Sequence, residues 1–297
     1  LQNAFQSFLI VAEKPTFGLI ISIISGVSNM ILDFLFIYVF KMGVFGAALA
    51  TGISQLIGVS IPLVYFITKK NHILQFTKTE FELKPIIQTI TNGSSEMLTN
   101  LSTSLVNMLF NAQLMKYVGA DGVVAYGIIM YVGFIFSGTY IGYSIGSAPI
   151  VGYHYGAENK DELKSLLKKS IILIVISSLF ITGFAEILSK LLASIFVSYD
   201  ENLLNMTTIS IRLFSISYLI SGFNIFASSF FTALNNGFVS AVISFFRTLV
   251  FQIIMIYLLP AIWGINGIWL AVAFAEILSL FVSIMFFAKN KKKYQYA

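Results

Sequence analysis

Residues 29–55 read NMILDFLFIYVFKMGVFGAALATGISQ, two apolar runs joined by a short turn that contains Gly43. The first run carries Asp33, and the second carries Thr51. A carboxylate at membrane depth costs about 2.5 to 3.5 kcal/mol on insertion scales, so its presence there indicates function. Asn29 precedes Asp33 by one helical turn and shares its face. We therefore predict that Asn29, Asp33 and Thr51 bind a small cation.

The alternative for Asp33 is a carboxylate near a helix end that reaches interfacial water. Asp33 lies eight residues before Lys41, where the turn begins. At a rise of 1.5 Å per residue, this separation corresponds to about 12 Å along the helix. This depth favours a cavity over the interface.

The composition is that of a polytopic membrane protein. Of 297 residues, 57% are hydrophobic and 10% are charged, and the mean hydropathy is +0.87. Soluble globular proteins have about 25% charged residues. The absence of cysteine from the sequence excludes disulfides and thiolate metal sites. The net charge of +5 comes from lysines in short loops, so we expect no nucleic-acid partner.

Eight apolar segments reach the roughly 20 residues that span a bilayer. They cover residues 16–40, 44–68, 86–117, 123–152, 166–196, 204–233, 238–259 and 264–288. A shorter apolar run ends at Ala12, and we expect it to be the end of a helix whose start precedes this chain. Turn residues separate the segments, and Pro260 is expected to break the chain between the last two. The predicted fold is all-α, with eight transmembrane helices and a helix stub.

Lysine placement predicts the orientation in the membrane. Clusters lie in residues 69–84, 160–169 and 289–293, and we expect all three on the cytoplasmic side. Lys41 is the exception. The predicted organisation is a remnant of an N-terminal lobe (1–68), a cytoplasmic connector (69–85), a C-terminal six-helix lobe (86–288) and a cytoplasmic tail (289–297).

An internal repeat appears when the chain is shifted by 221 positions. This shift aligns Gly43 with Gly264 and Gly46 with Gly267. In each copy, the two glycines lie at the start of an apolar segment. Two copies with the same orientation are parallel repeats, which predicts about twelve helices in two lobes, with about 130 residues of the first copy preceding this chain.

Four motifs resemble signatures of the multidrug and toxic compound extrusion (MATE) family of cation-coupled efflux transporters. In family order they are Asn29-x-x-Leu32-Asp33, Gly43-Val44-x-Gly46-Ala47-Ala48-x-Ala50-Thr51, Gly119-x-x-x-Val123-x-Ala125-Tyr126-Gly127 and Pro149-Ile150-Val151-Gly152-Tyr153-x-Tyr155-Gly156-Ala157. The resemblance covers the chain from the end of the fourth family helix to the twelfth. It implies a cation site in the N-terminal lobe, of which Asn29, Asp33 and Thr51 match three members. The fourth, an aspartate on the first family helix, lies outside this chain, so the site is incomplete within it.

Span 86–117 carries a stripe of polar residues on one face. Its members are Asn92, Glu96, Asn100, Thr103, Asn107 and Asn111, within an arc of roughly 100°. Lipid leaves such groups unpaired, so the stripe faces either a wet cavity or another helix. In the cavity interpretation, Glu96 is the protonatable or cation-attracting member. We predict that this stripe and Glu276, which aligns with Gln55 in the repeat, are linked to substrate or proton binding.

Other charged residues within the spans are expected to have structural roles. Arg212 and Arg247 can each pair with an acidic group or extend to lipid headgroups. Glu186 and Lys190 have the i, i+4 spacing of a local ion pair.

The resemblance implies an antiporter driven by Na⁺ or H⁺ that exports amphipathic, often cationic drugs by alternating access of two lobes. We expect a monomer in the cell membrane, no enzymatic activity and no cofactor besides the coupling ion. A lipid-linked saccharide flippase of the same superfamily is an alternative, but its pyrophosphate cargo calls for a basic cavity. An integral-membrane enzyme would need a metal or nucleophile constellation that the spacing does not offer. A membrane fragment that does not transport by itself is the remaining alternative.

Overall fold

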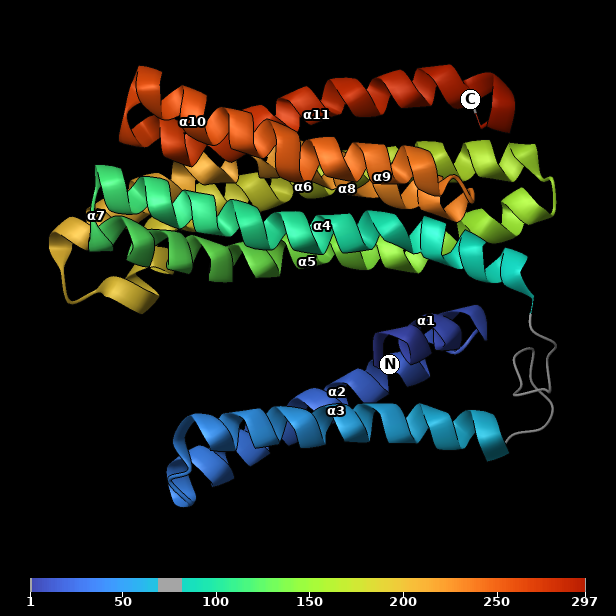
Figure 1. The fold of residues 1–297 in the computed structure, drawn as a ribbon, viewed down its shortest axis with the longest axis horizontal. Coiled ribbons are helices and arrows are strands. Elements are labelled where there is room, and N and C mark those ends of the chain that lie inside the picture. Colours follow the sequence, from blue (N-terminus) through green and yellow to red (C-terminus); the bar gives the residue numbers. More distant parts are fainter. Residues whose placement is uncertain (1, 69–81, 297) are drawn as a thin grey trace. The chain divides into compact units, whose positions relative to one another are not determined.

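The computed structural model describes residues 2–68 and 82–296, and these residues form helices without any β-strand. Contacts divide the chain into two compact units, Leu1–Phe81 and Glu82–Ala297 (Figure 1). Within these described ranges, six helical segments are long and apolar enough to cross a membrane, or seven if one bent pair counts as a span. The predicted all-α polytopic membrane class is confirmed. Most of the predicted connector, residues 69–81, lies outside the described residues.

Unit 1 consists of α1 (Gln2–Val11), α2 (Pro15–Asp33), the π-helix η1 (Phe34–Val39) and α3 (Gly43–Thr68). Pro15 opens α2, where its missing N–H has no helical partner to lose. The Ser25 hydroxyl of α2 donates to the Ser54 carbonyl of α3 at 2.8 Å. This bond fixes which face of α2 is turned toward α3.

Unit 2 contains the remaining helices, α4 (Leu83–Tyr117), α5 (Ala120–Gly156), α6 (Lys160–Val197), α7 (Glu201–Ser215), α8 (Tyr218–Ala233), α9 (Gly237–Phe245), η2 (Phe246–Val250), α10 (Phe251–Trp263) and α11 (Ile265–Tyr294). The pairs α4 with α9, α5 with α8, α6 with α7 and α10 with α11 pack closely. Side chains of Asn159, Asp200 and Asn236 accept backbone N–H groups at the starts of α6, α7 and α9. These caps end the preceding turns and fix where each helix enters the bundle.

Two of the eight predicted spans differ in character from the other six. The segment predicted at 86–117 is α4, which is long enough to span but falls below the apolarity of the other spans because of its polar stripe. The segment predicted at 204–233 is not one straight helix. It consists of α7 and α8, which meet at a bend of 47°.

One predicted break near the C-terminus is wrong. Pro260 does not break the chain, because α10 continues through it to Trp263 and ends at Gly264, whose φ of +58° is left-handed. The predicted tail from residue 289 is helical up to Tyr294. Beyond it, the buried Tyr296 donates to the Phe287 carbonyl at 2.9 Å. Burial raises the pKa of Tyr296, so the phenol remains protonated and able to donate.

The glycines aligned by the repeat have matching conformations. Gly43 has φ +57° and Gly264 has φ +58°. A Cβ on Gly46 would lie 3.0 Å from the Phe36 Cβ, and one on Gly267 would overlap the Leu259 carbonyl oxygen. In both copies the second glycine therefore lets its helix approach the end of the preceding one.

We predict that Gly267→Ala destabilises unit 2 by about 1–3 kcal/mol, because the new methyl group meets backbone atoms that cannot rotate away. Thermal unfolding of the purified protein in detergent, followed by tryptophan fluorescence, measures the change. Gly183→Ala in α6 is the matched control, since its Cβ meets nothing within 4 Å. Equal melting temperatures for the two variants would contradict the close approach at Gly267.

Candidate functional site

A cavity of about 170 Å³ lies inside unit 2. Its walls come from α4, α5, α7, α8, η2, α10 and α11. The lining residues are Thr103, Val106, Asn107, Phe110, Tyr126, Met130, Ser137, Phe214, Ser217, Tyr218, Ser221, Arg247, Thr248, Gln252, Val272 and Glu276. The cavity thus combines aromatic rings with hydroxyl, amide and charged groups.

Two interruptions of regular helix line this cavity. The π-helix η2 carries Arg247 and Thr248, and the bend between α7 and α8 carries Ser217. The Thr248 hydroxyl donates back to the Ser244 carbonyl at 2.7 Å, a bond that competes with regular helical bonding. Irregular backbone at membrane depth is tolerated where it lines a cavity, and π-helical turns are frequent at functional sites. Both interruptions therefore mark the cavity as the candidate functional site of unit 2.

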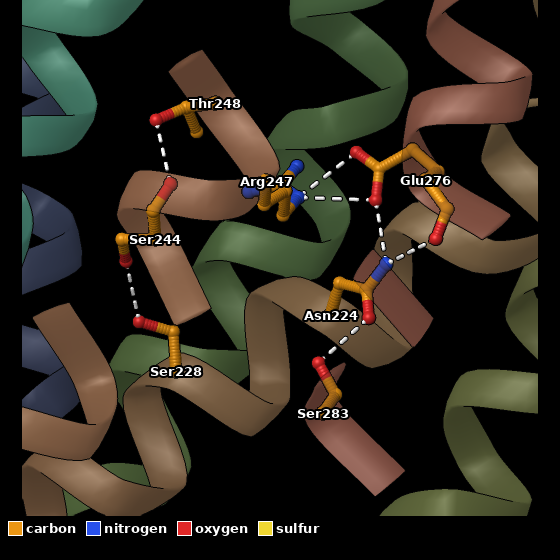
Figure 2. A network of polar contacts seen from close by, with 7 residues as sticks. All are labelled: Asn224, Ser228, Ser244, Arg247, Thr248, Glu276 and Ser283. Carbon is orange, nitrogen blue, oxygen red and sulfur yellow. Dashed lines mark hydrogen bonds and ion pairs between the residues drawn. The ribbon is translucent and has the colours of Figure 1, made fainter. Parts of the chain in front are cut away.

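An ion pair links η2 to α11 at the cavity wall. Nε of Arg247 donates to both carboxylate oxygens of Glu276, at 2.9 and 3.1 Å (Figure 2). Arg247 lies ten residues after Gly237 and Glu276 eleven after Ile265, so both lie about 15–17 Å into their spans. That depth is near the middle of a hydrocarbon core of about 30 Å. Pairing makes the two charges tolerable there.

Asn224 of α8 completes the coordination of Glu276. Its side-chain N–H₂ donates to Glu276 Oε2 at 2.7 Å and to the Glu276 carbonyl at 2.9 Å. Its own side-chain oxygen accepts from the Ser283 hydroxyl at 2.9 Å. Figure 2 shows these contacts converging from separate helices. The network joins α8, η2 and α11 around one buried carboxylate.

Several polar atoms of the cavity lining have no partner within the described residues. They include Oγ of Ser221 and Oε1 of Gln252, whose residues are only 6% and 7% exposed. The two terminal amino groups of Arg247 also make no hydrogen bond there. Buried polar groups are nearly always paired, and a water takes about 30 Å³, so the cavity holds roughly five waters or one small ligand.

The structure divides the polar stripe predicted on α4. Thr103 and Asn107 line the cavity, and the Asn107 side-chain oxygen accepts from the Tyr126 hydroxyl at 2.7 Å. Asn92 instead donates to the Thr232 carbonyl of α8 at 3.2 Å.

The other members of the stripe, Glu96, Asn100 and Asn111, are exposed. The stripe therefore meets different surroundings along α4, because a helix of 35 residues has different neighbours along its length.

In unit 1, Asn29 and Asp33 share the half-buried face of α2 that carries Ser25. Nδ2 of Asn29 and Oδ1 of Asp33 are buried and have no partner within the described residues. The π-helix η1 begins immediately after Asp33. Thr51 is exposed, and its hydroxyl donates to the Ala47 carbonyl at 3.0 Å. Of the three predicted cation ligands, only Asp33 thus has an unpartnered oxygen that can take a cation, whereas the unpartnered atom of Asn29 is an N–H donor.

The predicted Glu186–Lys190 ion pair is wrong. The Glu186 carboxylate instead accepts from the Ser215 hydroxyl at 2.8 Å. Arg212 donates to the Ser189 hydroxyl at 2.9 Å and makes no ion pair within the described residues. No group of three or more histidine, cysteine, aspartate or glutamate side chains within residues 2–68 and 82–296 could hold a metal ion.

Sequence reasoning missed the functional setting of Arg247, Asn224 and Gln252. Opposite charges at similar depths in adjacent spans were the available signal for pairing Arg247 with Glu276. Asn224 and Gln252 gave no comparable signal, since polar amides occur in several spans.

The family profile described as MatE matches residues 96–258 of the chain. The multidrug export protein MepA of Staphylococcus saprophyticus is 23% identical over 274 residues, which cover 91% of this chain and 59% of that protein. MepA of Staphylococcus haemolyticus is 24% identical over 281 residues, covering 94% and 61%. This chain therefore spans about three fifths of the length of these relatives.

Solved structures share the fold. A MATE protein crystallised in complex with MaL6 has a TM-score of 0.93 and 18% identity, covering 100% of this chain and 67% of that one. An outward-facing multidrug resistance MATE family transporter of the MOP superfamily has a TM-score of 0.91 and 19% identity, with the same coverage.

We predict that Glu276→Gln destabilises unit 2 by about 3–5 kcal/mol, because it leaves the buried Arg247 without a counter-charge. The double variant Arg247→Gln with Glu276→Gln should lose less stability, since no unpaired charge remains. Thermal unfolding can be followed through Trp269, which is buried on α11. A double variant less stable than Glu276→Gln would contradict the charge argument.

Proposed function

Because the chain belongs to the MatE family, we propose that it forms the C-terminal part of a cation-coupled antiporter that exports amphipathic, often cationic organic compounds. The multidrug export activity named for the MepA relatives supports this proposal. The chain spans only part of those relatives, so the activity belongs to the whole protein.

The unpartnered carboxylate oxygen of Asp33 carries this proposal. It lies within a segment long and apolar enough to cross a membrane, where an acidic side chain without a partner is costly. A bound Na⁺ or H⁺ neutralises the carboxylate and so removes the free-energy cost of the unpaired charge. Asn29, Asp33 and Thr51 are therefore the proposed cation ligands, and no other cofactor is required.

Coupling needs only that the cation bind two conformations unequally. A cation held at Asp33 stabilises the conformation in which its ligands are assembled, and export follows from alternation between inward-open and outward-open states. In this proposal no covalent step occurs, and the energy comes from an ion gradient rather than from an enzymatic reaction.

The polar face of α4 and the cavity beside it are the proposed contacts for substrate or protons. Glu96, Asn92, Asn100, Asn107 and Asn111 belong to α4, and Glu276 lies on α11. Glu96 is exposed and makes no ion pair within the described residues, so its charge is available to attract an organic cation. Glu276 is already paired with Arg247, so its charge is less available than that of Glu96 to attract an organic cation.

We place the protein in the cell membrane as a monomer with a cytoplasmic C-terminus. The lysines of residues 160–169 and 289–293 support this orientation under the positive-inside rule.

We predict that Asp33→Asn in the full-length protein lowers gradient-driven ethidium efflux by about tenfold, because the coupling ion loses its charged ligand. Proteoliposomes with sodium and pH gradients imposed separately measure the effect and identify the ion. Asp121→Asn is the matched control, since Asp121 is exposed in the first turn of α5. Unchanged efflux in Asp33→Asn would remove the proposed site.

We predict a smaller effect for Glu96→Gln, an increase of at most about fivefold in the ethidium concentration needed for half-maximal efflux, because an exposed charge pair contributes about 0.2–1 kcal/mol. The same vesicles measure it over a range of salt concentrations. Added salt should reduce the difference from the wild type. A difference that is independent of salt would argue against electrostatic attraction.

A further inference from the structure

Arg247 uses only one edge of its guanidinium group in the ion pair. Both hydrogen bonds to Glu276 come from Nε, so the two terminal amino groups keep four N–H donors without a partner in the described residues. The side chain remains 17% accessible and lines the cavity. A planar fork of this kind matches a carboxylate through two parallel hydrogen bonds.

We propose that the cavity of unit 2 binds the carboxylate of a small aromatic acid through the terminal amino groups of Arg247, and that one proton enters with each carboxylate. This site is distinct from the proposed cation site at Asp33 and does not depend on export.

The remainder of the lining fits the rest of such a ligand. The rings of Phe110 and Tyr126 are stacked with their centroids 5.0 Å apart, and Phe214 and Tyr218 also line the cavity. The unpartnered Ser221 hydroxyl can donate to a carboxylate oxygen. A volume of about 170 Å³ is below the 300–1,000 Å³ of pockets that hold drug-sized molecules. This volume suits a ligand of about one ring and its carboxylate.

Charge balance requires the accompanying proton. Arg247 and Glu276 together carry no net charge, so a bound carboxylate alone would leave one uncompensated negative charge near mid-membrane. One proton, shared between Glu276 and the ligand, restores neutrality while Arg247 keeps a negatively charged partner. The complex then holds one guanidinium, one carboxylate and one carboxylic acid.

Few other groups can take up this proton. The other titratable side chains of the lining are the phenols of Tyr126 from α5 and Tyr218 from α8, and both are neutral donors at ordinary pH. The described lining residues from α4, α7, α10 and α11 add no further charge besides Glu276. Asn224, which contacts Glu276 from α8, does not titrate.

Benzoate is a suitable probe, with benzamide and benzylammonium as matched neutral and cationic controls. Calorimetry of the full-length protein in lipid nanodiscs, repeated in two buffers of different ionisation enthalpy, counts the protons taken up. We expect benzoate to bind and both controls to bind at least tenfold more weakly. We also expect about one proton per benzoate, and affinity that falls about tenfold per pH unit while the free probe is ionised.

Variants separate charge recognition from general packing. Glu276→Gln leaves Arg247 as the only charge, so benzoate should bind more tightly and without proton uptake. The double variant Arg247→Gln with Glu276→Gln keeps the cavity neutral and should lose benzoate binding at least tenfold. Arg212→Gln, an arginine outside the lining, should bind benzoate as the wild type does.

Equal binding of benzoate and benzamide would overturn the site, and benzoate binding without proton uptake by the wild type would overturn the charge balance. Both readouts need only the wild type, so they remain decisive if Glu276→Gln fails to fold. The calorimetry in nanodiscs involves no ion gradient, so its result does not depend on transport. If the wild type exports ethidium but does not bind benzoate, only this site is overturned. If it binds benzoate but does not export ethidium, only the export proposal is overturned.

Discussion

The contact between Arg247 and Glu276 is the interaction on which the organisation of unit 2 depends. Neither charge is tolerable alone near the middle of a membrane span, and each removes the cost of the other. Bringing them together requires η2 to pack against α11, and Asn224 then draws α8 to the same point. The ion pair and its amide partner thus link α8, η2 and α11 near the middle of their spans.

The cavity beside the ion pair follows from the same requirement. The π-helix presents Arg247 at the wall, and the bend before α8 supplies Ser217 and Tyr218. Each interruption removes regular helical bonds, which lipid would not replace. A polar cavity supplies those groups with partners, so the interruptions and the cavity are parts of one arrangement. The unpaired atoms of Ser221 and Gln252 are what remains for water or a ligand to satisfy.

The two units treat their acidic groups differently. Glu276 has a counter-charge and two contacts with Asn224, whereas Asp33 makes no ion pair within the described residues and keeps one buried oxygen unpartnered. A small cation can therefore gain more at Asp33 than at Glu276. This difference underlies the proposed division of roles, in which unit 1 takes the coupling ion and unit 2 takes a group that Arg247 can recognise.

The sequence by itself determined the membrane class, the approximate spans and the faces on which polar residues lie. Hydrophobicity and helical period are local properties, and lipid enforces them segment by segment. Even where α4 was unusually polar, its length and position were predicted closely. The repeat also identified Gly43 and Gly264 as corresponding turns, because both positions need a left-handed conformation.

Only the tertiary structure decided which partner each polar group meets. The helical period places Asn92 and Asn107 on one face of α4, but the neighbours of that face change along the helix. Asn92 bonds to α8, whereas Asn107 lines the cavity. Likewise, the residue type of Pro260 predicts a break in the chain, but in the structure Pro260 lies inside α10. The pairing of Arg247 with Glu276 joins residues 29 positions apart, and such a contact depends on how whole helices pack, which no local pattern encodes.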